Sequence, residues 1–289
     1  MKSSPRIGVA DRRSATIRRL RSNKINHTRW KIRVGKRRRP LGSRSVMRHG
    51  KSTMPVITFA NTKGGAGKTT AVLLLATELE NMGLRVTVLD ADPQCWISRW
   101  RENSGDRTKV KVVPYVSQAT LEKHIHQGKR ESDYVLIDLP GARTPLLAKA
   151  IGYSNHVLIP IQGCSMDAQG GAHVIELMQY LADKGNIHIP FSIVLTRVNS
   201  MVTTRALQTV KALLAERRVP VLNTPIIERS AFRDVFDFGG SLHTLANARV
   251  SNLGKARDNA RAFADEVLMH EALRNKQRQD QVAALRAVA

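Results

Sequence analysis

The sequence predicts an α/β fold in which a mostly parallel, twisted sheet carries helices on both faces, preceded by a basic segment. From Pro55 onward, apolar runs of strand length alternate with amphipathic segments of helix length. Strands that are separated by crossover helices pair in parallel and need a helical layer on each face. A chain of 289 residues is long enough to bury the core of one such domain.

The segment 1–53 differs in composition from the rest of the chain. It holds 18 of the 47 Lys and Arg residues but a single acidic residue, Asp11. Mutual repulsion predicts that it is disordered when free. Three interpretations stay open: a phosphate-binding tail, an Arg-rich organellar transit peptide, or a lead that is not translated, with Met54 as the true start. We therefore expect the folded domain at 54–289.

The individual elements follow from the hydrophobic pattern. The continuous apolar run at 56–60 predicts a buried strand, and 69–82 has helical spacing that ends at Gly83. Residues 84–89 predict the next strand, which ends at Asp90. The same criteria predict strands at 110–115, 134–137, 157–161 and 193–198, helices around Leu121, Leu146, Ile175 and Leu207, and a final helix over 255–289 with the apolar stripe Ala260, Phe263, Ala264, Val267 and Leu268.

A glycine-rich loop lies between the first strand and the first helix. Its sequence is Thr62-Lys63-Gly64-Gly65-Ala66-Gly67-Lys68-Thr69-Thr70. Such glycines let main-chain N–H groups turn inward around a phosphate, and the helix N-terminus adds its positive end. Lys68 is placed to bridge the β- and γ-phosphates, the Thr69 hydroxyl to bind Mg²⁺, and Thr70 to donate to the α-phosphate. The strand, loop and helix together predict a P-loop that binds ATP with Mg²⁺.

Two residues distinguish this loop from the common P-loop pattern. Thr62 stands where the first glycine is usual, and a second lysine, Lys63, precedes the glycine pair. The run KGGxGKT resembles the deviant Walker A loop of the ParA/MinD family of P-loop ATPases, and the resemblance extends from about Met54 to the last helix. It implies an ATP-dependent homodimer in which Lys63 reaches the partner's nucleotide, so that Lys63 and Lys68 are both expected to serve catalysis.

Carboxylates follow two more of the expected strands. Residues 88–94 (VLDADPQ) resemble the family's second motif, which implies that Asp92 positions the attacking water and that Asp90 lies near the metal. The strand that ends at Asp138 is interpreted as the Walker B strand, and this carboxylate is expected to hold Mg²⁺. Leu139 departs from the family's usual Thr. No strong general base is visible in the sequence, so we expect slow hydrolysis that a ParB-like or adaptor protein stimulates.

Segments nearer the C-terminus resemble the family more weakly. Residues 196–199 (TRVN) resemble its adenine-side segment, which implies Asn199 as a base contact, with a turn residue as the alternative. Residues 226–233, followed by the glycine pair of 238–240, resemble the loop and helix after the last strand in partition ATPases. Together with 98–100 they also resemble the ParA-like ATPases of DNA-transfer systems. The process served is therefore plasmid partition, chromosome partition or DNA transfer.

The net charge of +24 predicts a polyanionic partner. No helix-turn-helix signature is evident, so DNA binding rests on charge alone. The candidate contacts on or beside two predicted helices are Arg205, Lys211, Arg217 and Arg218 on one, and Lys255 and Arg257 on the other. Such patches hold phosphates without reading bases, which predicts salt-sensitive, non-specific DNA binding. An ordinary solvated helix face is the alternative. We expect a cytoplasmic, nucleoid-associated ATPase that binds DNA in its ATP state.

Two other classes of protein share this scaffold. A MinD-like membrane-positioning ATPase needs an amphipathic C-terminal anchor, for which Val282, Leu285 and Val288 offer a thin apolar stripe. A metabolic or electron-transfer enzyme of the nitrogenase iron-protein kind needs cluster thiolates, and Cys95 and Cys164 lack the spacing for them. No apolar run reaches the length of a membrane span, so a membrane partner is not expected.

Overall fold

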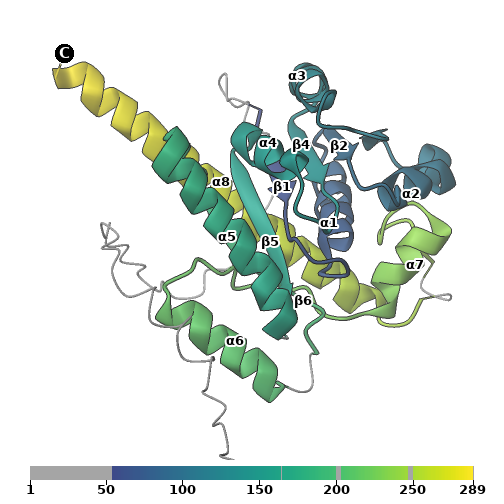
Figure 1. Ribbon diagram of the computed structural model, residues 1–289. Coiled ribbons are helices and arrows are strands. Elements are labelled where there is room, and N and C mark those ends of the chain that lie inside the picture. Colours follow the sequence, from purple (N-terminus) through teal and green to yellow (C-terminus); the bar gives the residue numbers. More distant parts are fainter. Residues whose placement is uncertain (1–53, 164, 200–202, 247–249, 289) are drawn as a thin grey trace, which may run out of the picture. The chain divides into compact units, whose positions relative to one another are not determined.

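Figure 1 shows the computed structural model, which describes residues 54–163, 165–199, 203–246 and 250–288. The three interpretations of segment 1–53 and the prediction for Cys164 lie outside these residues. The described residues form a six-stranded parallel sheet between two layers of helices. The fold class predicted from the sequence is confirmed.

The sheet places several carboxyl ends of strands at one edge. Its strands are β1 (Val56–Phe59), β2 (Val86–Asp90), β3 (Lys111–Val113), β4 (Tyr134–Asp138), β5 (His156–Gln162) and β6 (Phe191–Thr196), in the order β3-β2-β4-β1-β5-β6. The register pairs Phe59 with Asp138 and Asp90 with Asp138. The ends of β1, β2 and β4 therefore meet where ligands bind in sheets of this kind.

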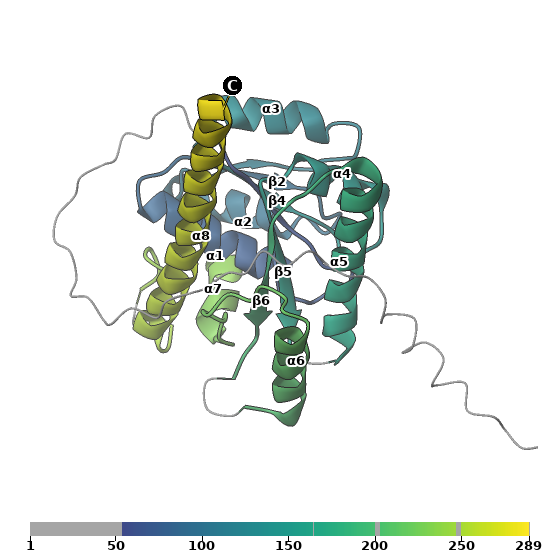
Figure 2. The same ribbon diagram turned by 90° about the vertical axis from the view of Figure 1, so that its left-hand side faces the viewer.

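Helices cover both faces, as the parallel pairing requires. One layer contains α1 (Lys68–Asn81), α2 (Trp96–Ser104), α7 (Ser230–Phe238) and α8 (Leu253–Val288); the other contains α3 (Leu121–Glu131), α4 (Pro145–Tyr153), α5 (Ser165–Gly185) and α6 (Arg205–Glu216). Figure 2 shows α8 and α5 on opposite sides of the strands. Each layer forms its own hydrophobic core with one face of the sheet.

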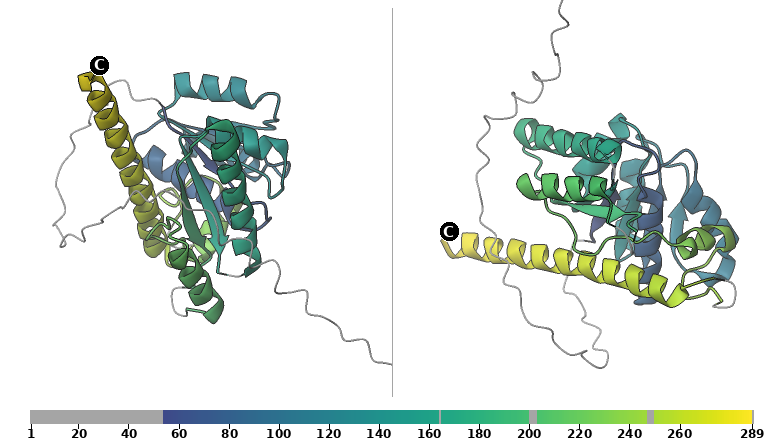
Figure 3. Two further views of the ribbon diagram at one scale, coloured as in Figure 1. Left: turned by 60° about the vertical axis from the view of Figure 1, so that its left-hand side comes forward. Right: turned by 90° about the horizontal axis from the view of Figure 1, so that it is seen from below.

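The last helix packs on α1 through the predicted stripe. Ala260, Phe263, Ala264 and Val267 are at most 1% exposed, and Leu268 is partly buried against the same core. The C-terminal part of α8 extends past the other elements (Figures 1 and 3). A short 3-10 turn (Gly105–Arg107) follows α2 on the same face.

A buried histidine anchors the middle of α8 to the sheet. Arg274 of α8 donates to Nδ1 of His156 at 2.9 Å, and Nε2 of His156 lies 3.1 Å from the Ser192 hydroxyl on β6. Because Nδ1 accepts a hydrogen bond, the ring is neutral with its proton on Nε2. Burial, followed by the charges of Arg274 and His270, lowers the pKa of His156 well below its ordinary value.

Three local features differ from the sequence prediction. The strand expected at 110–115 is shortened to β3, because Tyr115 adopts φ 54° and leaves the extended conformation. Helix α2 was not predicted. The segment 220–228 runs parallel to β6 at the free edge of the sheet, and the N–H of Ile193 donates to the Pro220 carbonyl at 2.8 Å. This pairing covers the edge of the sheet that β6 would otherwise expose.

The C-terminal apolar stripe is described in part. Val282 is 48% exposed, whereas the side chains of Leu285 and Val288 lie outside the description, so a membrane anchor stays an untested alternative. Within the described residues, no helix combines the length and the hydrophobicity that crossing a bilayer requires.

Candidate functional site

The glycine-rich loop connects β1 to the N-terminus of α1 at the carboxyl edge of the sheet. Gly67 caps α1 with φ 90°, a conformation that side chains with a Cβ disfavour. A Cβ at this position would also lie 3.2 Å from the side chain of Thr196 at the end of β6. Glycine is therefore required here both by the turn and by the close approach of β6.

Neighbouring strands hold the loop from outside. Asn61 is buried; its amide donates to the Pro160 carbonyl at 2.7 Å and its oxygen accepts from the Lys63 N–H at 2.9 Å. The Thr196 hydroxyl donates to the Ala66 carbonyl at 2.8 Å, and the Gln162 amide donates to the Gly65 carbonyl. The last two contacts use carbonyl oxygens rather than the N–H groups that a phosphate needs. The loop is thus held open for an anion.

Lys68 is buried beneath this loop. Its ammonium donates to the Lys63 carbonyl at 3.2 Å. Burial lowers the pKa of Lys68, and the charges of Asp138 and Asp92 oppose that effect. A desolvated ammonium without a full ion pair gains most from a bound polyphosphate, which supports its predicted role. Lys63 lies at the rim of the loop and is half-buried.

Asp138, at the end of β4, is fully buried, and neither of its carboxylate oxygens accepts a hydrogen bond of normal geometry from the described residues. Burial raises its pKa to about 8, with the nearby Asp90 and Asp92 adding to the rise and Thr69 and Lys68 opposing it. When it is ionised, so deeply buried an acid needs a compensating cation. This residue therefore fits a Mg²⁺ ion, with the Thr69 hydroxyl beside it.

The described residues contain no cluster of three His, Cys, Asp or Glu side chains that would hold a metal unaided. Mg²⁺ does not require one, because it commonly binds through one or two carboxylates together with phosphate oxygens and water. The Thr69 hydroxyl and the Asp138 carboxylate thus fit the protein's share of such a site.

The two carboxylates after β2 already have protein partners. Asp90 is fully buried and accepts from the main-chain N–H of Ser98 at 2.9 Å and from its hydroxyl at 2.7 Å. Burial nevertheless raises the pKa of Asp90. Asp92 accepts from the Gln94 N–H at 2.9 Å, which shapes the turn that leads into α2. Asp90 therefore holds the start of α2. If it lies near the metal as predicted, it would contact the ion indirectly.

The loop after β4 lies directly against the phosphate loop. A Cβ on Gly141 would lie 2.5 Å from the Gly64 nitrogen and 2.7 Å from the Lys63 carbonyl carbon. The Pro140-Gly141 step thus approaches main-chain atoms that only a glycine tolerates. Leu139, which replaces the family's usual Thr, is 1% exposed within the core and contributes packing rather than a hydroxyl. The loop after β4 and the phosphate loop are therefore in direct main-chain contact.

A groove beside the start of α1 is the candidate base-binding region. Gly67 and Thr70 line one side of it; the other side is formed by residues after β6 and on α7, including Arg197, Glu228 and Arg233. Arg197 has φ 50°, and Glu228 forms ion pairs with Arg233 at 2.8 Å and Arg197 at 3.7 Å. Asn199, the predicted adenine contact, is not among the lining residues. Sequence reasoning did not show that Arg197 lines this groove, because its place there depends on the left-handed turn.

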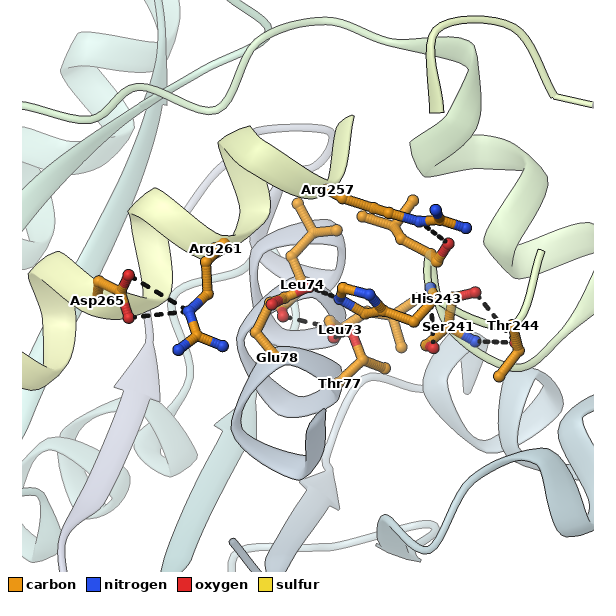
Figure 4. Close-up of polar contacts among 11 residues, drawn as sticks. Leu73, Leu74, Thr77, Glu78, Ser241, His243, Thr244, Arg257, Arg261 and Asp265 are labelled. Carbon is orange, nitrogen blue, oxygen red and sulfur yellow. Dashed lines mark hydrogen bonds and ion pairs between the residues drawn. The ribbon is translucent and has the colours of Figure 1, made fainter. Parts of the chain in front are cut away.

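The predicted basic patches belong to opposite layers, since α6 and α8 pack on different faces of the sheet. The four basic residues at α6 and Lys255 on α8 are exposed. Arg257 differs: its guanidinium donates to the carbonyls of Leu242 at 2.8 Å and Leu245 at 3.3 Å. Figure 4 shows the Arg257 side chain next to His243. Beside it, Nε2 of His243 lies 2.7 Å from the buried Glu78 carboxylate of α1. Arg257 is thus engaged in holding the 241–246 loop.

Cys95, the cysteine that the structure describes, was predicted to lack the spacing of a cluster ligand. Cys95 is 5% exposed, and its Sγ donates to the Asp92 carbonyl at 3.4 Å. Burial raises the pKa of this thiol. A protonated, buried thiol inside a turn suits packing better than ligation of a cluster.

The phosphate loop, its buried lysine and the unpartnered carboxylate define a P-loop nucleotide-binding protein. Residues 54–276 match the family model described as VirC1 protein. The chain belongs to the VirC1 family, within the ParA/MinD family of P-loop ATPases.

Individual relatives agree with this assignment. The protein ParA of Rhizobium radiobacter is 32% identical over 223 residues, which cover 76% of this chain and 100% of that protein. The protein virC1 of the same organism is 33% identical over 203 residues, which cover 67% of this chain and 85% of that protein. Among solved structures, an ATP complex of McdA from Cyanothece matches with a TM-score of 0.58 at 17% identity, over 75% of this chain and 97% of that one. That structural likeness shows the fold alone.

Proposed function

We propose that this protein is an ATPase that dimerises on ATP, binds DNA non-specifically in that state, and releases it after hydrolysis that a partner protein stimulates. The observation that carries the proposal is the contact between the two nucleotide-sensing loops. Gly141 lies against the main chain of Lys63 and Gly64, so a γ-phosphate in the cradle would bias both loops together. Lys63 would then complete the site of a second copy.

Each residue of the site has a defined task in this proposal. Lys68 and the N–H groups of the loop bind the phosphates, and Thr69 with Asp138 holds Mg²⁺. The bound Mg²⁺ neutralises charge on the β- and γ-phosphates. Asp92, at the rim beyond β2, orients the attacking water. The chain offers no strong general base here, which supports slow hydrolysis that a ParB-like or adaptor protein accelerates.

The cargo follows from charge and from relatives. Exposed basic side chains at α6 and at the start of α8 suit phosphate contacts without base readout. Relatives include ParA and virC1 proteins and a chromosome-partitioning ATPase of Thermus thermophilus. We infer that the protein positions DNA during partition or transfer.

Sedimentation with ATP and Mg²⁺ tests the proposed switch. The Asp92→Ala variant should sediment as a dimer and bind duplex DNA, because it keeps the γ-phosphate contacts but loses the residue that orients water. Lys63→Ala should bind ATP as a monomer, whereas Lys184→Ala, at the exposed end of α5, should match the unaltered protein. A monomeric Asp92→Ala protein that ignores duplex DNA would refute the dimer switch.

A further inference from the structure

Two exposed aromatic side chains follow the carboxyl ends of β2 and β3, and the proposed function does not use them. Trp96, the first residue of α2, is 47% exposed, and Tyr115, in the loop after β3, is 79% exposed. Large aromatic rings are favourable to bury and are enriched where proteins contact partners. Their exposure on a folded domain therefore calls for an explanation beyond packing.

The backbone holds both rings in place at a conformational cost. Cys95, which caps α2 just before Trp96, has φ 52°, and Tyr115 has φ 54°. This left-handed region is unfavourable for residues other than glycine, and most of all for bulky ones. The Cys95 thiol lies beside the Tyr115 main chain, whose N–H opposes the rise that burial causes in the thiol pKa, so the two left-handed residues are neighbours. The next residue, Val116, donates to the Asp90 carbonyl at 3.0 Å.

Polar neighbours orient the indole and add a positive charge. Nε1 of Trp96 donates to the Gln94 side chain at 2.8 Å, which fixes the plane of the ring. The Arg99 guanidinium lies over the ring, 5.3 Å from its centroid. A cation on one face of an indole leaves the other face for stacking. The result is an oriented indole that carries a cation on one face.

We propose that Trp96, Arg99 and Tyr115 form a stacking surface for the unpaired bases of single-stranded nucleic acid. Aromatic rings combined with arginine bind bases of any sequence through their π-faces, and the guanidinium suits a phosphate. The Arg99 guanidinium on the indole supports an anionic ligand over a basic or neutral one, and two exposed rings favour stacked bases over an acidic protein segment. This mode differs from the duplex binding proposed above, which relies on phosphate contacts and needs no exposed ring.

Intrinsic fluorescence tests the proposal on the full chain. The protein has three tryptophans, and Trp100 is buried, so a Trp30→Phe background leaves Trp96 as the exposed reporter within the described residues. Titration with oligothymidylate, without nucleotide and at 0.3 M salt to weaken phosphate contacts, should quench this emission saturably. A duplex of equal length should quench it far less. Omitting nucleotide separates this result from the fate of the ATP switch.

Variants give the decisive comparison. Because Trp96 is itself the reporter, the variants are compared by the anisotropy of fluorescein-labelled oligothymidylate. Trp96→Ala and Tyr115→Ala should each raise its Kd about 5- to 150-fold, as expected for loss of one stacked base. Trp96→Phe should restore most of the affinity, and Tyr180→Ala, which removes a 61% exposed ring from α5, should leave it unchanged. Unchanged affinity in both alanine variants would overturn the proposal. So would a concentration-dependent change of Trp96 emission without DNA, which would assign the surface to contact between copies of the chain.

Discussion

The contact at Gly141 provides the sharpest test of how the site is built. In Gly141→Ala, the new methyl group would lie 2.5 Å from the Gly64 nitrogen and 2.7 Å from its Cα. Carbon atoms in good contact stay about 3.5 Å or more apart, so the main chain of one loop must move by roughly 1 Å. Overpacking of this kind costs about 1–3 kcal/mol. The strain falls on the loop whose N–H groups must converge on the phosphates.

We therefore expect Gly141→Ala to weaken binding of ATP·Mg²⁺ about 5- to 150-fold, as measured by titration calorimetry. Gly152→Ala is the matched control, because Gly152 is exposed within α4 and a Cβ there meets nothing within 4 Å. It should bind nucleotide normally and gain up to about 1 kcal/mol of stability from helix propensity. Nucleotide affinity within twofold of the unaltered protein in Gly141→Ala would refute the coupling of the two loops.

Three further changes test other parts of the structure. Asp138→Asn should stabilise the nucleotide-free protein at neutral pH by about 1–3 kcal/mol, because folding of the unaltered chain must protonate this buried carboxylate, whose pKa is raised to about 8. It should also abolish the Mg²⁺-dependent gain in ATP affinity. A lower melting temperature of the nucleotide-free variant would contradict this. The pKa of His156 is lowered in the folded protein, so the unfolded chain takes up a proton first as the pH drops through about 6.5. The free energy of unfolding should therefore fall by at most ~1.4 kcal/mol per pH unit below that pH. Urea unfolding at pH 7.5 and 5.5 should show a smaller difference in His156→Gln than in the unaltered protein. Arg257→Ala should lose about 1–2 kcal/mol of stability, because it removes the two hydrogen bonds to carbonyl oxygens. Lys255→Ala should keep its stability and reduce by about 1 the slope of log K for DNA binding against log salt concentration. Equal stability of the two variants would argue against the assigned role of Arg257.

These tests separate binding from support. Asp138 and Lys68 are expected to meet the nucleotide and its metal, whereas Gly141, Asn61 and Thr196 act by holding main-chain atoms in place. Substitution of Gly141, Asn61 or Thr196 changes nucleotide affinity by displacing the loop, so the loss of affinity should grow with that displacement. Substitution of Asp138 or Lys68 removes an interaction outright.

The sequence by itself predicted the α/β fold, a glycine-rich loop between β1 and α1, and a carboxylate at the end of β4. These predictions succeed because each depends on local order along the chain: a buried apolar run, a glycine-rich turn, and a helix start in direct succession. The second lysine of the loop, Lys63, was also identified from the sequence, because the resemblance to the deviant Walker A loop rests on consecutive residues.

Only the tertiary structure decided which residues support that site. Gln162 and Thr196 reach the loop from the ends of β5 and β6, and Gly141 approaches it across nearly eighty residues of chain. Asn61, at the start of the loop, is bonded to the Pro160 carbonyl of β5. The engagement of Arg257 with the 242–245 carbonyls was equally hidden, since a charge on a predicted helix gives no sign of where it points. Contacts between distant segments depend on how the layers pack, and hydrophobic periodicity fixes the layer a residue joins but not the neighbour it meets.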